Sequence, residues 1–166
     1  IPNAKKASRL DKACLPFFRI TLCLALVFHL CGYLLRWYIG GRIPLSNGYE
    51  TMQFLALSIL AVAALLQRRF PFLTTFGFLL AGFTLLVSYL GQMNPQITPL
   101  MPVLASPLLS GHVSIIMIAY ALLAFTFLDG ILALLLYRRY GEKDERVLQL
   151  TILSRLLLYP ATFFLG

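Results

Sequence analysis

Two histidines, His29 and His112, are the residues of this chain best suited to ligate a transition metal or to transfer a proton near neutral pH. Each lies in or beside a long apolar run, where an ionisable side chain costs free energy and often serves a function. His112 follows a proline-rich segment that ends at Gly111, so we expect it where a helix meets water. Three roles are open for it: an ordinary residue at a helix end, a proton relay or a ligand.

The spacing of these residues does not indicate a single metal centre. His29 lies about twelve residues into its apolar run, ~18 Å from the inner end of a helix at 1.5 Å per residue. His112 lies at the outer boundary, whereas two axial ligands of one haem iron must share a depth. We expect His29 to form a hydrogen bond within the bundle. The cysteines have no CxxC spacing and are interpreted as buried, inert thiols; they are Cys14, Cys23 and Cys31.

The elements that position these residues must be membrane helices. The chain has 166 residues, of which 60% are hydrophobic and 12% charged, whereas soluble domains are roughly 25% charged. Five apolar runs approach the ~20 residues that a bilayer core requires, at 17–37, 49–66, 72–90, 112–137 and from 150 onward. Lipid offers no partners to backbone polar groups, so helices are predicted. The predicted fold is all-α: a polytopic transmembrane bundle of about five helices.

We expect this chain to be a piece of a longer protein. Residues 1–16 lack the apolar core of a signal peptide, and we interpret them as a cytoplasmic flank or a junction with an upstream part. Residues 17–166 are interpreted as a partial membrane domain. The last apolar run reaches Gly166 without a cap or a flanking charge, so we expect that helix to be truncated.

The basic residues predict an orientation. Ten of them flank the apolar runs on one side, and only Arg36 and Arg42 lie on the other. The positive-inside rule therefore places the N-terminus in the cytoplasm and His112 at the outer face. Anionic membrane lipid at the inner surface accounts for the net charge of +8, so a nucleic-acid partner is not expected.

The first outward segment, "GGRIPLSNGYE", contains the polar candidates. Ser46 or Asn47 is expected to cap the helix that follows, and Glu50 in its first turn would complement the helix dipole. The alternative interpretation is a polar cluster of Arg42, Asn47, Tyr49 and Glu50 at the outer surface. In that case Arg42 is suited to hold an anionic group.

The second outward segment, "GQMNPQITPLMPVLASPLLSG", has four prolines and more aliphatic residues than a solvated loop needs. It is expected either to lie on the membrane interface as a re-entrant turn or to form an apolar wall for a flat ligand.

Three stretches, "RWYIGGRIPLSNGYETMQFLAL", "ITPLMPVLASPLLSGHVSIIMIAYALLAFTFL" and "SRLLLYPATFFLG", resemble the cytochrome c assembly protein family. The resemblance is closest to the CcsA/ResC branch and the CcsBA fusions, and it covers roughly residues 17–166. It implies a multi-pass protein of the bacterial inner membrane that carries haem b to the outer face. There, haem is presented in reduced form for attachment to CxxCH motifs of apocytochrome c.

By position, His112 matches the first of the two outer histidines that ligate haem in this family. The resemblance therefore implies that His112 is an axial ligand of the haem iron, a normal role for a neutral imidazole. Arg42 is then expected to pair with a propionate. The preceding segment is expected to cover the macrocycle with Leu100, Met101, Leu104 and Leu108.

The resemblance also implies partners: apocytochrome c, a CcsB/ResB-type subunit or fused domain, and thiol-reducing, thioredoxin-like proteins. The full-length family protein acts as a haem-attachment component, and we expect this part alone to be inactive. The chain departs from the family pattern in three ways. Trp37 is its single tryptophan, without a Trp-rich segment, it has no second outer histidine, and the family's transmembrane haem histidines are not evident in it.

Two other interpretations do not involve haem. One is a cofactor-free permease or sensor subunit in which Glu50, Asp129 and His29 form an intramembrane polar relay. Asp129 would then pair with Arg138 or Arg155 near the cytoplasmic end. The other is an inert structural bundle.

Overall fold

The computed structural model describes residues 3–97, 107–141 and 145–166, with side chains for 14–97, 108–141 and 146–166. Each of the five expected helices is present: α1 (Asn3–Gly40), α2 (Gly48–Leu66), α3 (Leu73–Leu90), α4 (Pro107–Tyr140) and α5 (Glu145–Leu165). All five are long and apolar enough to cross a membrane. The described part contains no strand. The predicted all-α, multi-pass fold is therefore confirmed.

Several helices extend beyond the apolar runs that predicted them. Helix α1 begins at Asn3, not near residue 17, and α5 begins at Glu145, not near residue 150. Helix α4 begins at Pro107, so the predicted start at His112 was wrong. Proline suits the first position of a helix, because its φ is fixed and its missing N–H would have no intrahelical partner there. Apolar runs record the depth of the bilayer core, and helices continue past it into water.

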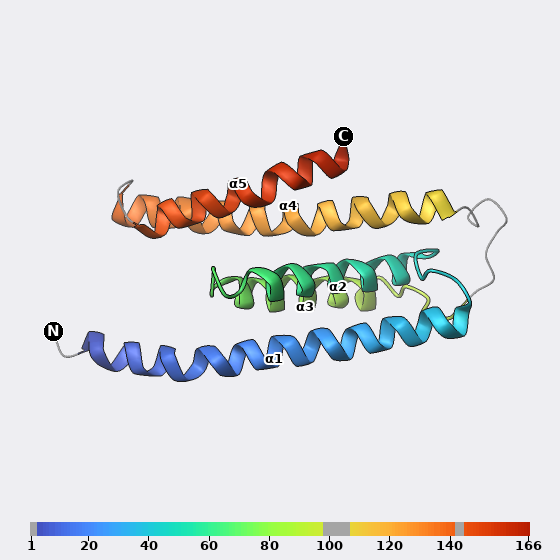
Figure 1. The fold of residues 1–166 in the computed structure, drawn as a ribbon, viewed down its shortest axis with the longest axis horizontal. Helices are drawn as coiled ribbons and strands as arrows, with labels where there is room; N and C mark the ends of the chain where they lie inside the picture. The colour runs from blue at the N-terminus through green and yellow to red at the C-terminus, as the bar shows by residue number, and fades with distance from the viewer. Residues whose placement is uncertain (1–2, 98–106, 142–144) are drawn as a thin grey trace.

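The helices form three layers (Figure 1). Helix α1 lies on one side, α2 and α3 form the middle, and α4 and α5 pack together on the other side (Figure 1). The end of α1, the start of α2 and the end of α3 meet at one end, which we call the Glu50 end. The end of α2, the start of α3, the end of α4 and the start of α5 lie toward the opposite end (Figure 1), which we call the Arg68 end.

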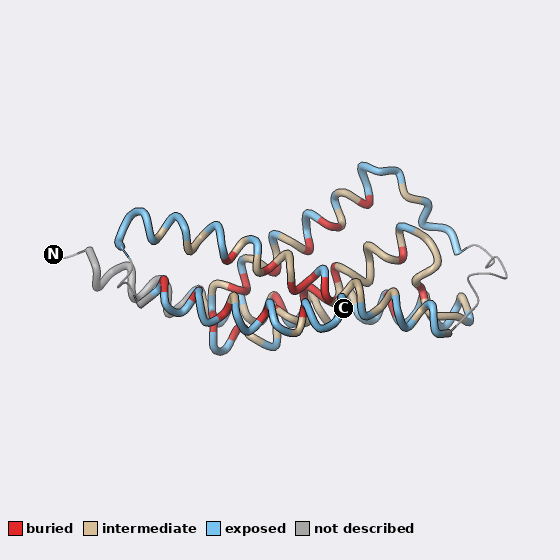
Figure 2. Tube along the Cα trace, turned by 90° about the horizontal axis from the view of Figure 1, so that it is seen from above, coloured by how far each residue is buried: buried red, intermediate tan, exposed pale blue. Residues whose placement is uncertain are grey.

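The core runs along the middle of the bundle, where the buried residues gather (Figure 2). Small side chains bring α2 and α3 close together. A Cβ atom added to Gly77 would lie 2.5 Å from the Cβ of Ala63, so this crossing requires glycine. Close approach through small residues is typical of helices that pack in lipid, where burying apolar surface gains little.

Large apolar side chains remain exposed on α1, as expected for helices solvated by lipid. The three cysteines share this exposure, so the prediction that they are buried was wrong. They lie on a helix whose main described contacts with the bundle are with α2 and α3, so much of its surface stays exposed.

Candidate functional site at the Glu50 end

A buried carboxylate organises the Glu50 end. Glu50, in the first turn of α2, is 1% exposed and lies between two arginines. Arg36 Nε donates to Glu50 Oε1 at 3.2 Å, and an Arg42 terminal nitrogen donates to Oε2 at 3.0 Å. The Ser46 backbone N–H donates to the same Oε2 at 2.9 Å. Each carboxylate oxygen is thereby both hydrogen-bonded and ion-paired, which a buried charge requires.

Helix α2 begins here because its first N–H groups find acceptors in the preceding turn. Asn47 is the N-cap residue, with extended backbone angles, and its Oδ1 accepts from the Glu50 N–H at 2.8 Å. Glu50 reaches back to the Ser46 N–H, so the two side chains satisfy donors at the helix start reciprocally, much as in a capping box. Of the two expected capping residues, Asn47 is the one that caps. The dipole interpretation of Glu50 describes only part of its role.

Arg36 is the functional residue that sequence reasoning missed. From the last turns of α1 it reaches beyond Glu50 and donates to the carbonyl oxygens of Pro95 at 2.7 Å and Gln96 at 3.2 Å. Its guanidinium also lies 5.1 Å from the centroid of the Tyr49 ring. One side chain thus joins α1, the start of α2 and the chain that leaves α3. Its position as a rare basic residue on the side predicted to face outward was the available signal.

The structure brings Arg42, Asn47 and Glu50 together, with Tyr49 joined to them through Arg36. We call Arg36, Arg42, Ser46, Asn47 and Glu50 the Glu50 cluster. Two guanidinium groups against one carboxylate leave it with a formal charge of +1. Arg42 also contacts the Ser46 hydroxyl, so it is held in place by its neighbours. The cluster is chemically suited to attract an anionic group at the bundle end.

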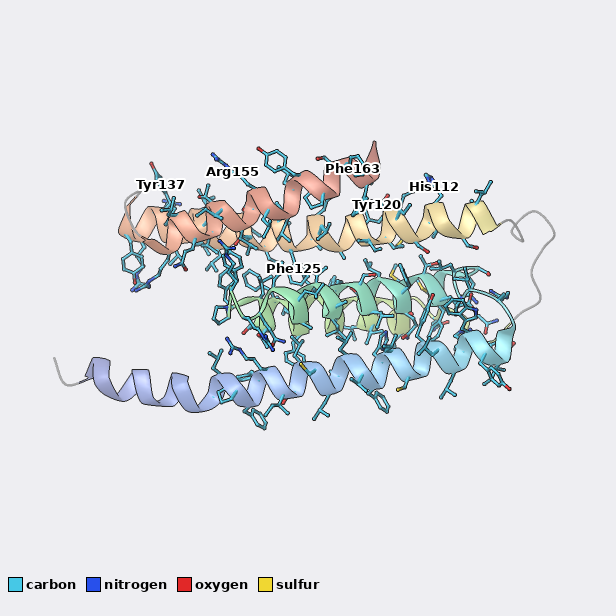
Figure 3. All side chains as sticks on the ribbon, in the orientation of Figure 1. His112, Tyr120, Phe125, Tyr137, Arg155 and Phe163 are labelled. Atoms are coloured by element: carbon cyan, nitrogen blue, oxygen red, sulfur yellow. The ribbon has the colours of Figure 1, made fainter. Side chains whose placement is uncertain are left out.

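His112 lies apart from this cluster, as the sixth residue of α4. Its side chain points away from α2 and α3 (Figure 3), and it is exposed. Within the described residues its ring makes no hydrogen bond or ion pair. A rigid helix therefore presents both ring nitrogens outward, and such an imidazole is available to bind a metal ion or exchange a proton.

The expected apolar wall is only partly visible. Leu100, Met101 and Leu104 lie outside the described residues. Leu108 is described, and it is 85% exposed near the start of α4. It stands one turn before His112 on the same helix, which places the two residues on neighbouring parts of one face.

His29 has the hydrogen bond that was expected of it. Its Nε2 lies 2.9 Å from the carbonyl oxygen of Gln53 and must donate, since a carbonyl only accepts. This bond ties the C-terminal half of α1 to α2. Among the described residues no group of three or more histidines, cysteines or acidic side chains is suited to hold a metal ion.

Asp129 is buried between α4 and α5, where the hydroxyl of Ser154 donates to its Oδ2. Within the described residues it forms no ion pair, so the pairing with Arg138 or Arg155 that the relay interpretation allowed is not observed. The reason is the orientation of α5, whose buried face contains Leu150, Leu153 and Leu157. Ser154 lies beside this face and reaches Asp129, whereas Arg155 lies on the exposed side of the helix.

No relay joins the three polar groups in the described part of the chain. His29 contacts Gln53, Glu50 contacts its two arginines and Asp129 contacts Ser154. These observed interactions do not connect to one another.

Comparison with known proteins places these features in a family. The family model described as Cytochrome C assembly protein matches residues 45–162, which include α2, α3, α4 and most of α5. Protein NrfI of Wolinella succinogenes is 38% identical over 109 residues, which make up 66% of this chain and 12% of that protein. The cytochrome c biogenesis protein CcsA of Cyanophora paradoxa is 38% identical over 120 residues, 68% of this chain and 35% of its own length.

CcsA of Chlamydomonas reinhardtii is 35% identical over 112 residues, 63% of this chain and 32% of that protein. The matched part thus spans about a third of the CcsA relatives and a smaller share of NrfI. Since the family model covers most of the helical bundle, this multi-pass membrane chain belongs to the cytochrome c assembly protein family.

Proposed function

We propose that this chain takes part in cytochrome c biogenesis by carrying haem to the outer face of the membrane and presenting it to apocytochrome c. Family membership supports the role, and the relatives are named for cytochrome c biogenesis. The observation that carries the haem-binding part is His112: an exposed imidazole, held by a long rigid helix near its end, with no partner in the described residues.

In this proposal the haem is the substrate, and His112 supplies one axial ligand to its iron. A ligand on a helix fixes the orientation of the macrocycle better than one on a loop. The exposed Leu108 offers apolar surface one turn away. The formal +1 charge of the Glu50 cluster favours an anionic group at this end, with Arg42 as the proposed propionate partner. Haem b as the form carried, and a CcsB/ResB-type part and thioredoxin-like reductants as partners, belong to the same proposal.

The proposed orientation places the Arg68 end in the cytoplasm of a bacterium and His112 at the outer face of its inner membrane. The Arg68 end carries Arg68 and Arg69 after α2 and Arg138 and Arg139 in the last turn of α4, whereas Arg36 and Arg42 lie at the Glu50 end. This asymmetry is the positive-inside pattern. Single cysteines introduced at Gly41 and Arg68, after removal of the three exposed native thiols, test it. An impermeant reagent should label Gly41→Cys in intact cells, and labelling of Arg68→Cys instead would reverse the orientation.

Substitution of His112 in the full-length protein tests the haem-binding role. His112→Ala should change the absorption spectrum of co-purified haem and sharply reduce cytochrome c maturation, because one axial ligand is lost. His112→Cys should retain haem with a shifted spectrum, since a thiolate ligand changes the electronic state of the iron.

His29→Ala is the matched control, because this histidine donates to a backbone carbonyl of α2 and is not a proposed haem ligand. It should leave the spectrum of the outer haem unchanged. A His112→Ala protein of normal abundance, spectrum and maturation activity would show that His112 is an ordinary helix residue.

A further inference from the structure

We propose that the Arg68 end contains a binding site for an anionic phospholipid, formed between α1 and the end of α2. A pocket of about 430 Å³ opens there, away from the Glu50 cluster and His112. Its lining combines two arginines, one buried amide, one thiol and three aliphatic side chains: Arg19, Arg68, Gln67, Cys23, Ile20, Leu24 and Val27. The site does not depend on the proposed haem function or on which side of the membrane this end faces.

The polar part of the pocket lacks a counter-charge. Arg19 donates from a terminal nitrogen to the carbonyl oxygen of Gln67 at 3.3 Å, but its buried Nε has no partner. Arg68 is exposed and has no ion pair or hydrogen bond with any described residue. The Oε1 atom of Gln67, a residue only 6% exposed, is also unpartnered. Two cations without a described carboxylate favour an anionic headgroup.

The apolar part of the pocket indicates that the ligand also has a tail. Ile20, Leu24 and Val27 lie at successive turns along one face of α1 and are 61%, 65% and 56% exposed. An acyl chain can pack along this row while the phosphate stays near the arginines. Basic pockets between membrane helices near the water boundary bind anionic lipid headgroups in this way.

This arrangement selects for negative charge. A zwitterionic lipid has the same phosphate, but its cationic group finds no carboxylate among the described side chains of the pocket. The Arg69 side chain, next to Arg68, does not line the pocket and instead lies near the ring of Phe70. A local binding site should therefore distinguish two adjacent arginines that general surface electrostatics would treat alike.

Native mass spectrometry of the purified full-length protein, titrated with phosphatidylglycerol or phosphatidylcholine, tests this site. The wild type should retain phosphatidylglycerol more tightly. Arg68→Gln should weaken phosphatidylglycerol binding about fivefold, the usual effect of one basic residue near a lipid headgroup. The double variant Arg19→Gln/Arg68→Gln should weaken it further, and Arg69→Gln should change it less than twofold.

Arg68→Gln is the decisive variant, because Arg68 makes no described contact whose loss would impair folding. Equal binding of the two lipids, or equal effects of Arg68→Gln and Arg69→Gln, would overturn the proposal. Displacement of the bound lipid by millimolar inorganic phosphate would identify a soluble-phosphate site instead. Displacement by haem, with an absorbance change that requires Arg19, would identify a haem entry site and would also overturn it.

Discussion

Two buried acids among the described side chains, Glu50 and Asp129, are accommodated in opposite ways. Glu50 is enclosed by two arginines and a backbone N–H at the Glu50 end, where the ends of α1, α2 and α3 meet. Asp129 lies within α4 and has one described partner, the Ser154 hydroxyl, while its Oδ1 has none.

The difference shows where charge can be stabilised in a membrane bundle. At a bundle end, helix termini and connecting chain supply arginines and free N–H groups from several directions. Between two packed helices, each backbone N–H is already bonded, so side chains on the facing helix are the main donors. We therefore expect the Glu50 carboxylate to stabilise the fold and the Asp129 carboxyl to contribute little to it.

Of the substitutions considered, Glu50→Gln should produce the largest change in the free energy of unfolding. It keeps the shape of the side chain but leaves two guanidinium groups without their shared counter-charge. Removing one member of a buried ion pair typically costs about 3 kcal/mol or more in the free energy of unfolding. Thermal unfolding of the purified full-length protein in detergent measures it. The double variant Glu50→Gln/Arg42→Gln removes the excess charge and should be less destabilised than the sum of its single variants; strict additivity would contradict charge pairing.

Arg36→Gln should have an intermediate effect of about 2 kcal/mol, because Arg42 still neutralises Glu50 while the bond to the carboxylate is lost. The bonds to Pro95 and Gln96 are lost as well, so a cysteine placed at Ile97 should react faster with a thiol reagent. Arg69→Gln, which changes an exposed arginine at the other end, is the control. Unchanged reactivity at Ile97 would show that Arg36 does not hold the chain that leaves α3.

Asp129→Asn should have the smallest effect, within about 1 kcal/mol, because the amide oxygen can still accept from Ser154 and no described ion pair is broken. The same melting experiment measures it, with Ser154→Ala as the companion variant. If Asp129→Asn lowered the free energy of unfolding as much as Glu50→Gln does, Asp129 would have to be charged and paired with a group beyond the described residues.

Sequence alone determined the class of the protein and the number of its spans, because bilayer thickness sets the length of an apolar run. It also indicated the start of α2, since capping by Asn47 depends on residues within three positions of it. The resemblance of three stretches, one of which contains His112, identified the family, and the comparisons confirmed it.

Only the tertiary structure decided which polar groups distant in the sequence meet. Arg36 and Glu50 are 14 residues apart, Asp129 and Ser154 are 25 apart, and Arg19 and Gln67 are 48 apart. No local rule relates residues at such separations, because the rotation and depth of each helix are fixed by packing. The close approach of Gly77 to Ala63 helps to set the register of α2 against α3. Helix formation thus depends on residues that are close together in the sequence. The partner of a buried charge depends on how the helices pack against one another.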